Sequence, residues 1–216
     1  MRFRRKYFRA ACFTTAAILL ISCLKDMPEE FPSSYVWNPE VALPLGVDSF
    51  GMNSESGFDT LLLNMDSLTG IPRWVDELEI VMQGSLHFDL GSLNETEEID
   101  HMMFRINLYN GFPDQASVQA YFQDAGSNPL DSMFREGPVN VPAARVIGNG
   151  EETDPGFIRK DASFTQEELR PLEAATSILF RASFSNLEVD SLLIPHYPTY
   201  EIIADIGVML GLNYEF

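Results

Sequence analysis

The sequence predicts a mainly β protein: an antiparallel β-sandwich with one short helix, after a cleaved signal peptide and a tether. Apolar residues recur at every second position in several short runs, which is the period of a half-buried strand. Glycine, proline and asparagine separate these runs as turns require, and one segment carries a helix start signal. With 216 residues, 45% of them hydrophobic and 12% aromatic, the chain is long enough to bury a core.

The first 22 residues are typical of a secretory signal peptide. Five of the 14 basic residues lie within residues 1–9, and an apolar stretch follows from Ala10 to Ile21. This stretch is shorter than the roughly 20 apolar residues that a membrane-spanning helix needs. We therefore expect residues 1–22 to be removed during export.

The signal peptide runs into Leu20-Ile21-Ser22-Cys23. This tetrapeptide resembles the bacterial lipobox, which has aliphatic residues, a small residue and then the cysteine that becomes the first residue. The resemblance implies a lipoprotein of the outer membrane, with a diacylglycerol on the thiol of Cys23 and an N-acyl chain such as palmitate. Several acyl chains hold a protein firmly, whereas one chain alone binds a membrane only marginally.

Leu24-Lys25-Asp26 follows directly. A Lys-Asp pair at this distance from the cysteine resembles the export signal of surface lipoproteins in Bacteroidota-type bacteria. The resemblance implies a place on the cell surface. The periplasmic face of the outer membrane is the alternative, with an ordinary polar tether at this position.

The charge of the mature chain excludes nucleic acid as a partner. Nine of the 14 basic residues remain after residues 1–22 are removed, against 32 acidic residues, so the formal charge is −23. Binding to phosphate backbones depends on Lys and Arg, which the acidic residues of this chain outnumber more than threefold. Cys12 leaves with the signal peptide and Cys23 is capped, so we expect no disulfide.

Two parts follow from the pattern of the mature chain. Residues 23–40 form a lipidated tether rich in proline and serine, and residues 41–216 form a single β-sandwich domain. Alternation predicts strands over residues 41–47, 78–82, 86–90, 102–109, 118–122, 139–143 and 178–184, and an apolar run over residues 58–64 predicts another. Pro44 and Gly46 place the first of these strands at a sheet edge. Asn110-Gly111-Phe112-Pro113 predicts a turn.

The helix signal is a capping box at Thr165-Gln166-Glu167-Glu168. It predicts a helix that begins at residue 166, and Pro171 should break this helix after its first turn. The long acidic segment before it, residues 148–156, is predicted as a loop.

The last segment, residues 199–216, has apolar residues at every second position. An unbroken strand of this length would reach roughly 60 Å, against a usual 17–20 Å. Gly207 and Gly211 are the positions where such a strand could bend, so we expect a long curved sheet.

The order of strands, turn and helix over residues 99–216 is similar to LEA-like sandwiches and tubular lipid-binding domains. This fold-level resemblance implies an inner face that forms a groove for acyl chains. A dry core requires the same apolar pattern, so both interiors remain open.

Four tripeptides have the form Asp-(Ser/Thr)-apolar, which resembles the O-glycosylation sequon of the same bacterial group. The candidate acceptor hydroxyls belong to Thr60, Ser67, Ser132 and Ser191. An attached sugar would have to lie on the surface.

No catalytic motif is present, and the histidines predict no metal site. His87 and Asp89 share a strand face, His101 follows Glu97, Glu98 and Asp100, and His196 lies between two prolines. None of these groups has the spacing of transition-metal or calcium ligands. Trp37 and Trp74 could stack on sugar rings, but packing is the simpler interpretation.

These observations predict a non-catalytic, lipid-anchored envelope protein that acts as an accessory or binding subunit of an outer-membrane assembly. We expect no enzyme activity and no cofactor apart from the lipid on Cys23. The expected partners are the membrane, through the anchor, and an outer-membrane protein complex. One alternative is a lipid-binding or lipid-carrying sandwich, and a second is a hydrolase that uses two carboxylates.

Overall fold

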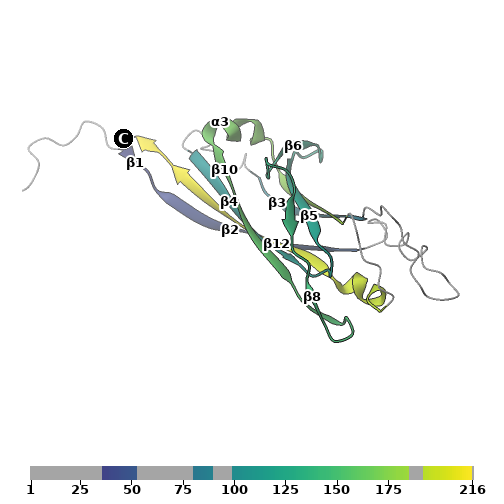
Figure 1. Cartoon of the computed structure of the whole chain (residues 1–216). Helices are drawn as coiled ribbons and strands as arrows, with labels where there is room; N and C mark the ends of the chain where they lie inside the picture. The colour runs from purple at the N-terminus through teal and green to yellow at the C-terminus, as the bar shows by residue number, and fades with distance from the viewer. Residues whose placement is uncertain (1–35, 53–79, 90–98, 185–191, 216) are drawn as a thin grey trace, which may run out of the picture. The chain divides into compact units, whose positions relative to one another are not determined.

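Antiparallel β-sheets and one short α-helix make up the part of the chain described by the computed structural model (Figure 1). The model describes residues 36–52, 80–89, 99–184 and 192–215, and Trp37–Tyr214 forms one compact unit. The predicted mainly β class with antiparallel sheets is confirmed. Within the described residues no helix is long and apolar enough to cross a membrane.

The first main sheet has four strands in the order β10-β4-β12-β2. They are β2 (Glu40–Gly51), β4 (Ile99–Asn110), β10 (Gly156–Thr165) and β12 (Glu201–Leu212). All three pairings are antiparallel. The predicted edge position of the strand around Pro44 is confirmed, because β2 ends this order.

The second main sheet has the order β3-β11-β5-β6, and β7 also pairs with β5. Its strands are β3 (Ile80–His87), β5 (Ala116–Gln123), β6 (Pro129–Ser132), β7 (Val139–Val141) and β11 (Ser177–Phe184). The smaller elements are β1 (Val36–Trp37), β8 (Arg145–Ile147), β9 (Glu152–Asp154), β13 (Tyr214–Glu215), α3 (Gln166–Leu169), η3 (Arg170–Leu172) and η4 (Ile194–Thr199).

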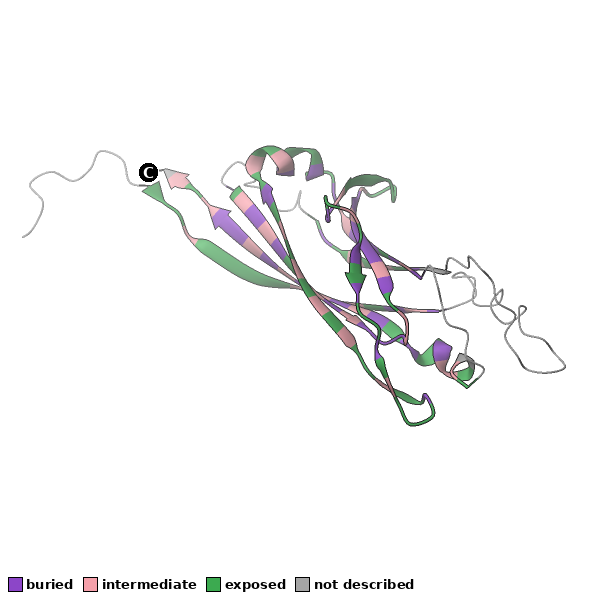
Figure 2. Ribbon diagram, in the orientation of Figure 1, coloured by how far each residue is buried: buried purple, intermediate pink, exposed green. Residues whose placement is uncertain are grey.

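A cluster of phenylalanines joins the two sheets. Phe104 of β4 and Phe164 of β10 pack against Phe122 of β5, with ring centroids 5.4 and 5.5 Å apart. Phe88, next to β3, meets Phe104 at 5.5 Å. Buried residues alternate with more exposed ones along β4 and β12, so one face of the sheet is the core face (Figure 2). The contacts are those of a β-sandwich.

The predicted turn after β4 is confirmed, and the side chain of Asn110, the last residue of β4, holds it by hydrogen bonds. The side-chain Nδ2 of Asn110 donates to the carbonyls of Asp114 and Pro142 at 2.7 and 2.9 Å. Its Oδ1 accepts from the amide of Phe112 at 2.9 Å. The fully buried Phe112 then packs on Phe184, with ring centroids 5.0 Å apart.

The helix follows the sequence prediction, and the last long strand does so in part, because β12 covers Glu201–Leu212 of the predicted residues 199–216. Thr165 and Glu168 form the capping box of α3, and Pro171 lies in the 3₁₀ turn η3 that follows it. The strand β12 pairs along its length, but its register shifts between Ile206 and Gly207 and between Gly211 and Leu212. The two glycines are therefore where the long strand departs from regular pairing.

Two predictions about strands are wrong. Gly84 does not separate two strands, since β3 runs through it. A Cβ at Gly84 would lie 2.5 Å from Cδ1 of Phe50, so this glycine allows a close approach between β3 and β2. The segment expected as a loop, residues 148–156, contains β9, which forms a hairpin with β8 just before this segment. The sequence pattern does not predict β10, which runs from the end of this segment to the capping box. The run predicted over residues 58–64 lies outside the described residues.

Candidate binding groove beside β10

The inner face of β10 is only partly covered. Along the neighbouring strand β4 the inward residues Phe104, Ile106 and Leu108 are fully buried. On β10, the residues whose side chains point to this same face, Ile158, Lys160 and Ala162, are only half-buried. Among the described strands β10 pairs with β4 alone, so no described strand pairs with its other edge, which is called the open edge below. The second sheet therefore leaves a strip of core face uncovered at this edge.

Residues 133–140, which comprise the connection after β6 and the first two residues of β7, face this strip across a groove. The groove has a volume of about 450 Å³ and is lined by residues 133–140 and by Ile158, Lys160, Asp161, Ala162 and Ser163. Gln119 fixes the segment, because its amide donates to the carbonyl of Phe134 at 2.9 Å and its Oε1 accepts from the amide of Phe134 at 3.2 Å. The groove therefore has one wall from each sheet.

The lining of the groove is mixed, and charged side chains stand among its apolar residues. Nζ of Lys160 lies 3.5 Å from Oε2 of Glu136, whose side chain is 91% exposed. The guanidinium of Arg135 lies over the ring of Phe164, 4.7 Å from its centroid. A cation over an aromatic face is attracted by the ring quadrupole, which holds Arg135 at this end.

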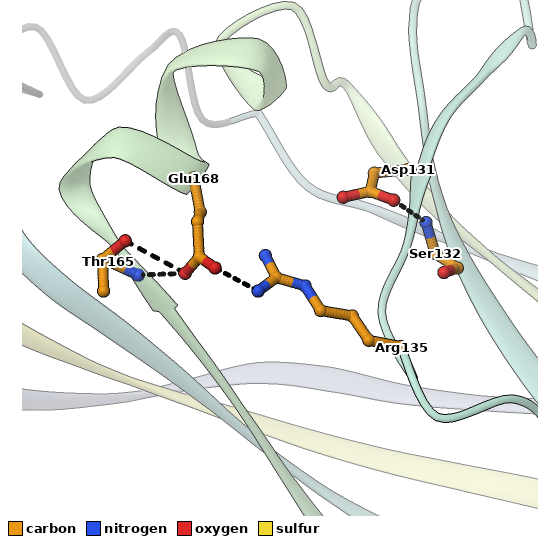
Figure 3. Close-up of polar contacts among 5 residues, drawn as sticks. All are labelled: Asp131, Ser132, Arg135, Thr165 and Glu168. Atoms are coloured by element: carbon orange, nitrogen blue, oxygen red, sulfur yellow. Dashed lines mark hydrogen bonds and ion pairs between the residues drawn. The ribbon is translucent and has the colours of Figure 1, made fainter.

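Figure 3 shows how Arg135 is tied to α3: its guanidinium reaches Glu168, which also meets Thr165. Oε2 of Glu168 accepts from the amide and the hydroxyl of Thr165 at 2.8 and 3.0 Å. The bond from the amide of Thr165, then the bond from Arg135 and the bond from the Thr165 hydroxyl lower the pKa of Glu168 to about 2. Glu168 is therefore ionised at neutral pH and holds Arg135, which lines the groove.

The outward charges of β10 are already used within the sheet. Arg105 donates from Nε and Nη2 to the two oxygens of Asp161 at 2.9 and 2.8 Å, and this pairing lowers the pKa of Asp161. Nε of Arg159 donates to Oδ1 of Asn107 at 3.0 Å. Lys160, on the groove side, has only the exposed Glu136 as an ion-pair partner among the described residues.

Two smaller cavities lie elsewhere on the unit. One of about 370 Å³ lies against the outer face of the four-stranded sheet, where Gly207 leaves room beside Met103 and Met209. The other, about 260 Å³, lies between His101, Gly211 and the start of β2. Among the described residues, neither cavity contains a cluster of three or more His, Cys, Asp or Glu residues that could hold a metal ion.

Of the predicted modification sites, only Ser132 falls within the described residues. It is half-buried at the end of β6, and its amide donates to Oδ1 of Asp131 at 2.7 Å (Figure 3). The residues outside the described part are Cys23, Thr60, Ser67 and Ser191. Lipidation and glycosylation therefore stay predictions.

The three histidines lie on separate elements. His87 ends β3, His196 lies in η4, and Nδ1 of His101 in β4 is 3.1 Å from Oδ2 of Asp100. The acidic neighbours Glu97 and Glu98 lie outside the described residues.

Trp37, a candidate for stacking on sugar rings, stacks on Tyr214 of the same chain. The ring centroids are 5.7 Å apart, and half of Trp37 stays exposed. Trp74 lies outside the described residues.

The sequence pattern does not mark the groove. A charged residue interrupts the apolar period of β10 at Lys160, and residues 133–140 carry no motif. The sequence does contain one weak signal for this site. Ile158, Lys160, Ala162 and Phe164 occupy every second position, so a charge lies among apolar residues on one face of the strand. A charge at an inward position of a strand indicates an edge strand or a site.

No known protein family and no curated protein matches this sequence. Among solved structures, the chain is similar to a protein of Parabacteroides distasonis ATCC 8503 that is inferred to be secreted, with a TM-score of 0.41 and 13% identity, over 63% of this chain and 39% of that one. It is also similar to the enzymatically active domain of tailspike protein 4 of bacteriophage CBA120, with a TM-score of 0.34 and 9% identity, over 84% of this chain and 20% of that domain. The chain thus spans two fifths or less of the length of either protein.

Proposed function

We propose that this protein is a non-catalytic, lipid-anchored subunit of an outer-membrane assembly, and that it binds its partner in the groove beside β10. Cys23 carries the anchor, and the proline-rich segment after it is the tether. The observation that carries the binding role is the half-covered inner face of β10 next to an open strand edge.

Two features of the groove support a binding role. Sheet edges present unpaired amide and carbonyl groups, which natural proteins either protect or use for recognition. Here the open edge runs beside a recess with an apolar floor at Ile158 and Ala162 and charges at Lys160 and Arg135. An apolar surface with a few placed polar groups is typical of a ligand site.

A lipid-carrying role is the second candidate, and the same groove favours it. Its volume of about 450 Å³ and its apolar lining at Pro138, Val139 and Ile158 suit an acyl chain. Native mass spectrometry of the secreted Cys23→Ala variant distinguishes the two roles. A retained lipid would favour the carrier, and a protein of unmodified mass would favour the binding subunit.

The hydrolase alternative has less support in the described residues. The carboxylates with shifted pKa values lie on different elements: Asp48 on β2, Asp124 after β5, Asp161 on β10 and Glu168 on α3. Burial raises the pKa of Asp48, while hydrogen bonds lower the pKa values of the other three. No described pair of these carboxylates lines one cleft.

Site-specific photo-crosslinking in the native cells tests the proposal. A photoreactive residue at Pro138, inside the groove, should capture one defined envelope protein. The same residue at Arg181, exposed on the other sheet, is the matched control and should not capture it. Equal products from both positions, or none from Pro138, would contradict the binding role.

The anchor has its own pair of variants in this experiment. Cys23→Ala should release the protein from the membrane fraction and abolish the crosslink. Cys12→Ala changes the other cysteine, inside the predicted signal peptide, and should leave both unchanged.

A further inference from the structure

The groove side of β10 carries an apolar–basic–apolar series. Ile158, Lys160 and Ala162 point to the same face, because side chains alternate along a strand and Phe164 of the same series is in the core. A strand added to the open edge would place its own side chains opposite these residues, about 4.5–5.5 Å away between Cβ atoms. Every second residue of that strand would face the groove.

Lys160 sets the charge that such a strand must carry. Its ammonium is 3.5 Å from Glu136, and their side chains are 40% and 91% exposed. Exposed ion pairs of this kind contribute little stability, so Glu136 is easily exchanged for another carboxylate. Asp161 also lines the groove, but its carboxylate is bonded to Arg105, and Arg159 is bonded to Asn107.

A second copy of this chain fits the edge poorly. If β10 of a second copy pairs antiparallel with this edge, the register that places Arg159 opposite Asp161 of the other copy also places the two Lys160 residues opposite each other. Like charges directly opposite each other destabilise a strand pair. Charge complementarity therefore favours an acidic strand from a different protein.

The geometry points to strand addition as the binding mode: an extended segment of the partner pairs with the open edge of β10 and presents an apolar–acidic–apolar series to the groove. Its Asp or Glu lies opposite Lys160, and its apolar side chains contact Ile158 and Ala162. This inference rests on the proposed function and names the chemistry of the partner.

A pair of synthetic peptides tests the charge preference. The first has the sequence Thr-Val-Thr-Glu-Thr-Val-Thr, and the second has lysine in place of the glutamate. Fluorescence anisotropy with the detergent-solubilised full-length protein should show that the glutamate peptide binds about tenfold more tightly. Hydrogen exchange should show new protection at every second amide of β10, those that point away from β4.

A charge swap separates recognition from a general loss of structure. Lys160→Glu should weaken the glutamate peptide about tenfold and strengthen the lysine peptide by a similar factor. A gain for one peptide cannot come from unfolding. Arg181→Glu makes the same charge change on the exposed face of β11 and should alter neither affinity.

Three results would overturn the inference: equal affinity for both peptides, no effect of Lys160→Glu, or no new protection in β10. Palmitate bound in the groove without any peptide binding would identify an acyl chain as the occupant and also overturn it. If crosslinking from Pro138 captures an envelope protein while neither peptide binds, the result supports the proposed function and contradicts strand addition.

Discussion

At the scale of single residues, a few positions require the residue that occupies them. Asn110 is fully buried and bonds three backbone groups at the end of β4. Gly84 lies where β2 crosses close to β3, and its missing side chain leaves room for Phe50 and Asp48. Asp48 also accepts from the backbone of Ser85 on β3, and its burial raises the pKa of this carboxyl. These residues fix how the two sheets meet.

Asn110→Ala should lower the free energy of unfolding by about 3 kcal/mol, because it leaves buried donor and acceptor groups without partners. In urea unfolding, this loss should appear as a lower urea concentration at the midpoint, while the slope of the unfolding free energy against urea concentration stays unchanged. Asn140→Ala, at an exposed position of β7, is the matched control and should change stability by less than about 0.5 kcal/mol. A loss below about 1 kcal/mol for Asn110→Ala would show that the turn holds without its side chain.

Gly84→Ala should destabilise the protein by about 2 kcal/mol, since the added Cβ would be 2.5 Å from Cδ1 of Phe50. Gly207→Ala is the comparison, because there the nearest atom, the carbonyl oxygen of Leu43, is 3.6 Å away. That change should be close to neutral. Thermal unfolding of both variants checks the difference, and equal shifts would contradict the close approach of β2 to β3.

At the scale of elements, β10 and α3 form a unit that shapes the groove. β10 supplies the open edge and the inward Lys160, while α3 holds Arg135 through Glu168. The capping box starts α3 directly after Phe164, the last core residue of β10. Lys160 in the middle of this edge also protects it, since inward charges on edge strands oppose unwanted pairing.

The stability contributed by Glu168 should depend on pH with a definite sign. Its pKa in the folded protein, about 2, lies below the ordinary value of 4.5, so its contribution is complete above pH 4.5 and is lost as the pH falls through 2. Glu168→Gln should therefore cost stability at pH 7 and almost none at pH 2, measured by thermal unfolding. Glu167→Gln, the exposed neighbour, is the control, and a pH-independent cost of Glu168→Gln would contradict this.

Lys160→Ile should increase self-association, because it makes the inner face of an open edge strand wholly apolar. Sedimentation velocity would show dimers or larger species at concentrations where the wild type shows fewer. Arg181→Ile adds the same apolar residue to β11, which is paired on both sides, and should not have this effect. Equal behaviour of the two variants would mean that the β10 edge is not accessible.

At the scale of the whole molecule, the sequence predicts the sandwich well and the groove poorly. The alternation in residues 199–216 and the bends at Gly207 and Gly211 are local patterns, so β12 could be predicted. β10 could not, because Lys160 interrupts its apolar face. The groove depends on residues 133–140 meeting β10 through the pairing of both sheets, and no local pattern encodes such a contact.

The proposed role depends on a lipid on Cys23 that fastens this sandwich to a bacterial envelope. The intact mass of the protein extracted from membranes gives the sharpest test of this anchor. We predict a chain that begins at Cys23 and is heavier than its amino acids by a diacylglycerol and one further acyl group. A free thiol on Cys23, or a chain that still contains residues before it, would contradict the claim.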